Sequence, residues 1–121
     1  MTLKIVIVGA GEVGYNLSKY LAKEDYSITV IDNDQNKCHK VKNAIDAKVI
    51  HGNGASQRIL QQIDMNEIDY FLALTPLDEI NLIASKAAKI LGAKKIISRL
   101  RNTEFNHKDA VLAPKDFNID Y

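Results

Sequence analysis

Short apolar runs alternate with helical patterns along the whole chain. The first run, residues 3–8, is apolar except at Lys4 and is rich in Ile and Val. A run that is apolar without alternation is typical of a parallel strand buried on both faces. Similar runs predict further strands at residues 28–31, 48–51, 70–74 and 95–98, and a short sixth strand at 110–112.

Apolar residues at helical spacing fill the intervals between these strands. This alternation of strand and helix predicts right-handed crossovers and an α/β fold. We expect a Rossmann-like, doubly wound parallel sheet of about six strands with helices on both faces, in a single domain over residues 1–121. The predicted helices cover residues 12–23, 35–44 and 78–91, and a shorter helix follows Ser56 as its N-cap.

The helix at residues 78–91 is apolar over a wider arc than one sheet face covers. Ile80 and Ile83 belong to the stripe that is expected to face the sheet, whereas Leu82 and Ile90 should point outward. Exposed apolar residues aligned on one helix favour a protein–protein surface. We therefore predict self-association, at least to a dimer, unless the end of the chain folds back over these residues.

A glycine-rich turn joins the first strand to the first helix. Its G-x-G-x-x-G spacing between a strand and a helix is typical of dinucleotide binding. Gly9 permits the tight turn, Gly11 lets the backbone approach a pyrophosphate, and Gly14 lets the helix pack closely on the strand. The helix amino terminus adds free N–H groups and partial positive charge. The candidate cofactor-binding residues here are Gly9, Ala10, Gly11, Glu12, Val13 and Gly14.

An acidic residue ends the second predicted strand. Asp32 lies 21 positions after Gly11 (32 − 11), close to the spacing of about 20 expected for an acid that binds ribose. A carboxylate there accepts hydrogen bonds from both ribose hydroxyls and repels a 2′-phosphate, so NAD(H) is favoured over NADP(H). Asn33 is a further candidate beside it. The alternative role for Asp32, capping the next helix, is one that Asn33 or Asp34 can fill.

The loops after the other strands should meet at the same edge of the sheet. Asn53 and Gly54 follow the third strand, near the expected adenine position, where an amide can both donate and accept. A flexible glycine loop is the alternative for this pair. Thr75 is expected to face the second ribose or the diphosphate, and Arg99 to bind a phosphate or an acidic residue of a partner chain.

Composition and charge exclude several classes of function. Of the 121 residues, 46% are hydrophobic and 26% charged, which is ordinary for a globular domain. The net charge of +1 (16 − 15) gives no basic face for nucleic acid. The single Cys38 cannot form an internal disulfide or a zinc site, so a cytoplasmic setting without a metal is expected. We also expect no secretory signal and no membrane insertion.

These motifs and their neighbours form an ordered series along almost the whole chain. They are residues 5–14, 30–34, 52–55 and 73–75, then Asp78, Glu79, Asn81, Arg99, Arg101 and Asn102. In this order they resemble the N-terminal RCK (KTN) domains of the TrkA family, the cytoplasmic regulatory subunits of Trk-type potassium uptake systems. The family usually has Gly-Asp-Ala after the third strand, where this chain has Asn53 and Gly54.

The resemblance implies a regulatory subunit and not an enzyme. Members of this family bind NAD⁺ or NADH, or in some relatives ATP or ADP, and form rings on the cytoplasmic face of a potassium-translocating membrane subunit. They gate potassium transport through a conformational change. On this basis Gly9, Gly11, Gly14 and Asp32 carry over as cofactor residues, and the chain should be a homo-oligomer that is peripheral to the inner face of the cell membrane.

Two other functions fit the same motifs. The first is the related NAD-binding regulatory domain of a cation–proton antiporter. The second is a truncated NAD-dependent dehydrogenase, although a dehydrogenase needs a further region to hold its substrate. The segment from Asp78 to Asn81 favours the Trk type.

Overall fold

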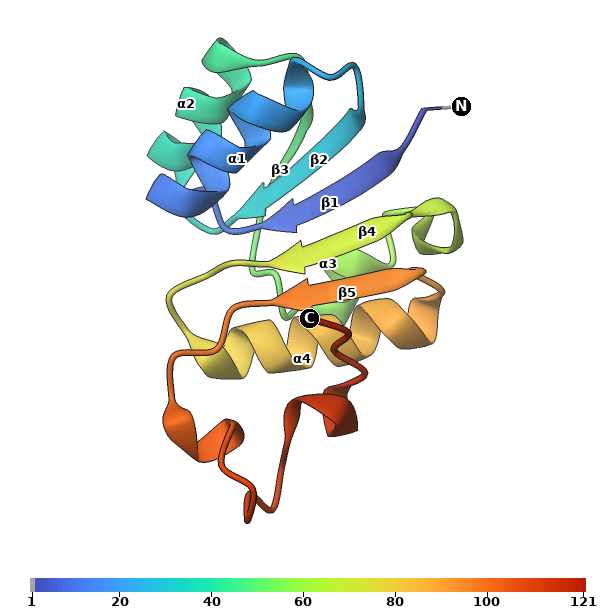
Figure 1. The fold of residues 1–121 in the computed structure, drawn as a ribbon. Coiled ribbons are helices and arrows are strands. Elements are labelled where there is room, and N and C mark those ends of the chain that lie inside the picture. Colours follow the sequence, from blue (N-terminus) through green and yellow to red (C-terminus); the bar gives the residue numbers. More distant parts are fainter. Residues whose placement is uncertain (1) are drawn as a thin grey trace.

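Five parallel strands form the centre of the structure, a computed structural model that describes residues 2–121 (Figure 1). Their order is β3-β2-β1-β4-β5, so the chain crosses from one edge of the sheet to the other side of β1 after β3. The predicted α/β fold is confirmed. The strands are β1 (Lys4–Val8), β2 (Ser27–Asp32), β3 (Lys48–His51), β4 (Tyr70–Ala73) and β5 (Lys95–Ser98).

Helices cover both faces of this sheet. The helices α1 and α2 lie on one face, and α3 and α4 lie on the other (Figure 1). Each predicted long helix and strand before the sixth strand agrees with the structure to within one residue at either end. The helices are α1 (Glu12–Ala22), α2 (Gln35–Ala44), α3 (Gln57–Leu60) and α4 (Asp78–Leu91), with 3-10 turns η1 (Met65–Glu67), η2 (Thr103–Phe105) and η3 (Pro114–Phe117).

The core has two halves, one on each side of the sheet. Alternate residues of β1 supply both: Ile5 and Ile7 pack under α1 and α2, whereas Val6 and Val8 pack under α3 and α4. Because a parallel strand in the middle of the sheet is buried on both faces, its sequence is apolar without alternation.

The predicted sixth strand is not formed at residues 110–112. These residues bend through solvent, and Val111 is 94% exposed. The place beside β5 is taken instead by Asp120 and Tyr121, where the Tyr121 N–H donates to the Ile96 carbonyl and the Ser98 N–H donates to the Tyr121 carbonyl. A strand forms only where a neighbouring strand can pair with it, and a short apolar run does not show whether such a partner is present. The run at residues 110–112 was therefore mistaken for a strand.

Two predictions about helix faces were wrong. On α4, Leu82 is buried and Ile83 is 48% exposed, the reverse of what their spacing suggested, although Ile90 is exposed as predicted. On α1, the large side chains of Val13 and Tyr20 are exposed as well. In both helices small residues are buried: Gly14 and Ser18 on α1, and Ala84, Ser85 and Ala88 on α4.

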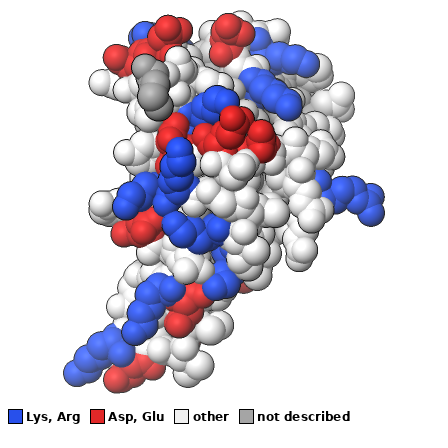
Figure 2. Space-filling model, turned by 90° about the vertical axis from the view of Figure 1, so that its right-hand side faces the viewer, with Lys and Arg blue, Asp and Glu red and all other residues white. Residues whose placement is uncertain are grey.

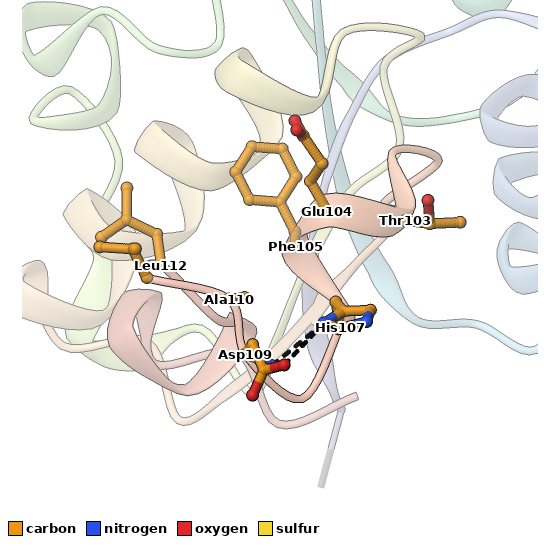
Figure 3. A pocket seen from close by; sticks show the side chains of 8 residues that line it. Thr103, Glu104, Phe105, His107, Asp109, Ala110 and Leu112 are labelled. Atoms are coloured by element: carbon orange, nitrogen blue, oxygen red, sulfur yellow. Dashed lines mark hydrogen bonds and ion pairs between the residues drawn. The ribbon is translucent and has the colours of Figure 1, made fainter.

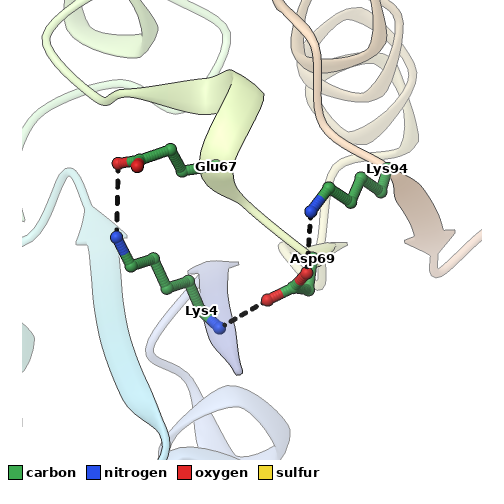
Figure 4. Close-up of polar contacts among 4 residues, drawn as sticks. All are labelled: Lys4, Glu67, Asp69 and Lys94. Atoms are coloured by element: carbon green, nitrogen blue, oxygen red, sulfur yellow. Dashed lines mark hydrogen bonds and ion pairs between the residues drawn. The ribbon is translucent and has the colours of Figure 1, made fainter. Parts of the chain in front are cut away.

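Ion pairs hold the amino-terminal ends of the strands. The Lys4 ammonium lies 3.2 Å from the Glu67 carboxylate, and the Lys94 ammonium lies 3.2 Å from Asp69 (Figure 4). Asp69 also accepts a hydrogen bond from the Lys4 backbone N–H at 2.9 Å, which joins β1 to the start of β4. On this face of the molecule basic and acidic side chains are intermingled, in agreement with the near-zero net charge (Figure 2).

Candidate functional site

A crevice of about 260 Å³ opens at the carboxyl ends of the strands. It lies where β1 and β4 part, since the chain runs from β1 toward one edge of the sheet and from β4 toward the other. In open α/β sheets this switch point is the usual ligand site. The lining residues are Val8, Gly9, Ile31, Asp32, Asn33, Lys37, Gly52, Asn53, Gly54, Thr75, Pro76, Leu77 and Ile80.

The structure gives a different answer for each of the three glycines of the turn to the question whether a larger residue could replace it. Gly9 has a φ of 108°, which side chains rarely tolerate. A Cβ on Gly14 would overlap the Gly9 carbonyl oxygen, so this glycine permits the close contact of α1 with the turn. A Cβ on Gly11 would meet nothing within 4 Å, and its φ of −70° suits any residue. The fold therefore does not require Gly11, and the space above it is open.

The first turn of α1 follows directly. Gly11 is the N-cap, with no side chain to cap the helix. The N–H groups of such a first turn have no acceptor within the helix. Glu12 and Val13 are exposed there, beside Ala10, whose N–H donates to Asp32. The residues of the predicted phosphate site are thus together at the rim, although among them only Gly9 lines the crevice.

Asp32 lies between the glycine turn and α2. One carboxylate oxygen accepts from the Ala10 N–H at 2.7 Å and the other from the Asp34 N–H at 2.8 Å. Asp34, not Asp32, is the N-cap of α2 and accepts from the Lys37 N–H at 3.1 Å. The Asp32 carboxylate is therefore fixed by two backbone groups and presented to the crevice.

The loop after β3 forms the far side of the crevice. Asn53 is exposed there, and its side-chain oxygen accepts from the Ala55 N–H at 2.9 Å. Gly54 is buried, and a Cβ on it would overlap the Val8 side chain. Gly54 thus lets the loop pack on β1, a structural reason that the sequence pattern did not reveal.

Thr75 and Arg99 follow β4 and β5. Thr75 lines the crevice, but its hydroxyl lies 2.7 Å from the side-chain oxygen of Asn81 and accepts from the Leu77 N–H at 3.2 Å. The Arg99 backbone N–H donates to Ala73, and its carbonyl accepts from Asn81. Arg99 is not among the residues that line this crevice.

Sequence reasoning missed Lys37, Pro76, Leu77 and Ile80 as lining residues. Lys37 is in the first turn of α2, where a cation is unfavourable beside the positive end of the helix dipole. This unfavourable position of the Lys37 charge was the feature of the sequence that could have marked Lys37 as a candidate site residue. The others are apolar residues of a loop and a helix start, and nothing in their spacing marks them.

Cys38 lies behind Asp32 and is buried. Its thiol donates to the Asp32 carbonyl at 3.3 Å. Burial raises the pKa of the Cys38 thiol, and the nearby Asp32 charge raises it further. The group therefore stays a neutral, packed thiol at neutral pH.

None of the helices described over residues 2–121 has the length and apolar character needed to cross a bilayer.

Comparisons with known proteins agree with this geometry. The model of the TrkA-N domain family matches residues 5–112. The chain is 40% identical over 103 residues to a Trk system potassium uptake protein TrkA homolog of Archaeoglobus fulgidus, covering 85% of this chain and 23% of that protein. It spans about a quarter of the length of the first curated relatives it matches.

Solved structures share the fold at low identity. The TrkA-N domain of the inner membrane protein ybaL from Escherichia coli superimposes with a TM-score of 0.81 at 18% identity, over 99% of this chain and 85% of that one. The GsuK channel bound to NAD superimposes with a TM-score of 0.70 at 16% identity, over 81% of this chain and 18% of that one. With the family model matching most of its length, this chain belongs to the TrkA-N domain family.

Proposed function

We propose that this chain is a regulatory nucleotide-binding domain of a Trk-type potassium uptake system, and that its ligand is NAD⁺ or NADH. The observation that carries the proposal is the crevice at the switch point of a member of the TrkA-N family, which the fixed Asp32 carboxylate lines and near which Gly11 leaves open space. The NAD bound to the similar GsuK channel supports the choice of ligand.

We assign each part of the dinucleotide to a region in or beside the crevice. The adenosine ribose hydroxyls donate to Asp32, and the pyrophosphate lies over Gly11 against the amino terminus of α1. The adenine lies toward Asn53, and the second half of the ligand points toward Thr75. Thr75 reaches it with a hydroxyl that is already oriented by Asn81.

Regulation follows if the ligand distinguishes two conformations. NAD⁺ and NADH must differ in affinity between two states of the assembly, since a ligand with equal affinity shifts nothing. In the proposal the domain is cytoplasmic, forms a homo-oligomer, and reaches the membrane through a potassium-translocating subunit. The curated relatives, named as potassium uptake proteins, support this over the antiporter and dehydrogenase alternatives.

Calorimetry tests the choice of ligand. NADH should bind the wild type more tightly than NADPH, because a 2′-phosphate would face the Asp32 carboxylate. Asp32→Asn should weaken NADH binding by about 1.5–3 kcal/mol, the usual worth of a hydrogen bond to a charged group, and narrow the gap to NADPH. Equal affinity for NADH in both proteins would remove Asp32 from the site.

Steady-state assays with NADH and a panel of small oxo acids test the absence of catalysis. Binding without oxidation of NADH is the expected result, whereas turnover would favour the dehydrogenase alternative. ADP and ATP titrations decide whether the adenosine half suffices for binding.

A further inference from the structure

Asn81 is a fully buried amide with every hydrogen-bonding position used. Its side-chain oxygen accepts from the Thr75 N–H at 3.0 Å and lies 2.7 Å from the Thr75 hydroxyl. Its NH₂ donates to the carbonyls of Thr75 and Arg99, both at 2.9 Å. An amide offers two donors and two acceptor positions, so Asn81 has no capacity left. It therefore joins the crevice loop after β4 to the backbone after β5.

Asp78 makes the adjoining connection one turn earlier on α4. The N-cap of α4 is Leu77, and the Asp78 carboxylate accepts hydrogen bonds from backbone groups of a distant segment. The Asn102 N–H donates to it at 2.7 Å and the Arg101 N–H at 3.0 Å. Asp78 is only 7% exposed, so these bonds are shielded from water.

The segment that begins at this connection, residues 103–112, protrudes from the body of the domain (Figures 1 and 2). The backbone N–H groups of this segment that form hydrogen bonds have their acceptors in residues 102–107. The Ala110 N–H, for example, donates to the His107 carbonyl. It surrounds a hollow of about 500 Å³, around which Figure 3 shows Phe105, Leu112 and the contact of His107 with Asp109. The two residues before this segment, Arg101 and Asn102, are bound to Asp78, which fixes the point where the segment leaves the body of the domain.

We propose that Asp78 and Asn81 are a pair of positioning residues that couple the nucleotide crevice to the 103–112 segment. The path is continuous: Thr75 lines the crevice, Asn81 joins Thr75 to Arg99, and Asp78 holds Arg101 and Asn102 at the base of the segment. A nucleotide that fixes the Thr75 loop also fixes this base. The inference rests on the proposed function and adds the route by which occupancy is transmitted.

Amide hydrogen exchange with and without NADH tests the coupling, after calorimetry has measured the NADH affinity of each protein. In the wild type, NADH should slow exchange in residues 101–112 at least about fivefold, the lower end of ordinary couplings between sites. In Asp78→Ala this ligand-dependent protection should vanish while NADH still binds. Asp78→Asn keeps one acceptor oxygen and should retain part of the NADH-dependent protection.

Glu79→Ala is the matched control. It removes the same charge from the same turn of α4, but the Glu79 side chain is exposed and its carboxylate has no hydrogen bond or ion pair among those found in residues 2–121. Its NADH-dependent protection should equal that of the wild type. Protection that persists in Asp78→Ala, or NADH binding without protection in the wild type, overturns the coupling alone. Absence of NADH binding in calorimetry overturns the proposed function and the coupling together.

Discussion

The glycines of the turn separate what the fold needs from what a ligand needs. Gly14 is required because any side chain would overlap the Gly9 carbonyl, whereas Gly11 faces open space. The G-x-G-x-x-G pattern marks both glycines as candidate binding residues, but it does not show that the fold requires one and not the other. Only the packing of α1 against the turn distinguishes them.

This difference predicts opposite outcomes for two similar substitutions. Gly11→Ala should keep the wild-type melting temperature and lose NADH binding, because the added methyl occupies the space of the pyrophosphate. Gly14→Ala should lower the melting temperature strongly, because the methyl must displace backbone. Thermal unfolding and calorimetry on both variants provide the check. A Gly11→Ala protein that binds NADH normally would contradict the pyrophosphate position.

Three predicted residues line the crevice, whereas the residues that hold them in place were not predicted. Gly9 and Thr75 follow strands and Asp32 ends one, and the carboxyl ends of parallel strands meet at one edge of the sheet. Asn81 was missed as a buried residue because a polar side chain within a helix is ordinarily placed toward solvent. Its partners, the carbonyls after β4 and β5, come together only in the folded chain.

At the scale of the element, small residues decide which face of a helix meets the sheet. Gly14 and Ser18 on α1, and Ala84 and Ala88 on α4, are buried. A pattern weighted by large apolar residues selects a neighbouring face instead. The positions and ends of the helices were therefore predictable, but their rotation about their own axes was not.

The rotation of α4 predicts unequal effects of two apolar truncations. Leu82→Ala should lower the free energy of unfolding by about 2–5 kcal/mol, because Leu82 is 4% exposed and its loss leaves a cavity. Ile90→Ala on the same helix should change it by less than about 0.5 kcal/mol, because Ile90 is 73% exposed. Urea unfolding of both variants is the measurement. Equal effects would contradict the observed orientation of α4.

The amino-terminal ends of β1 and β4 predict a dependence of stability on acid. The Lys4 backbone N–H, and then the Lys94 ammonium, lower the pKa of the Asp69 carboxyl below its ordinary 3.8. A lowered pKa in the folded state stabilises the protein above that ordinary value, and the contribution is lost as the pH falls through the folded value.

Asp69→Asn should therefore be less stable than the wild type near neutral pH, with the difference shrinking below about pH 3.8. Urea midpoints across the acid range provide the measurement. Lys48→Gln, on the outer strand β3, is a control for the loss of one surface charge. A difference that is constant with pH would assign the effect to packing rather than to ionisation.

For the whole molecule, the strand order explains why distant motifs converge. Residues from the loops after four strands line one crevice, because all five strands are parallel and the order reverses between β1 and β4. The alternation of elements predicted this much. It did not predict the path after β5, where an exposed segment replaces the expected sixth strand and the chain end pairs with β5.

The outer surface of α4 predicts self-association of the chain. Ile83 and Ile90 are exposed and line a groove of about 310 Å³ beside α3. In sedimentation the wild type should form dimers or larger species, and an Ile83→Glu, Ile90→Glu double variant should shift toward monomer. Tyr20→Glu, an exposed site on α1 across the sheet, is the control and should leave the assembly unchanged. A wild type that remains monomeric at high concentration would contradict this surface.

The most direct measurement is an NMR titration of the chain with NADH, following each backbone amide. We predict saturable shifts at Gly9–Gly14, at Asp32 and Asn33, and at the loop from Gly52 to Gly54, because these residues line the crevice or lie at its rim. Shifts that reach half of their final size at NADH concentrations on the order of 1 mM or below correspond to a dissociation constant in that range. Amides of the glycine turn that stay unmoved at saturating NADH would contradict the account.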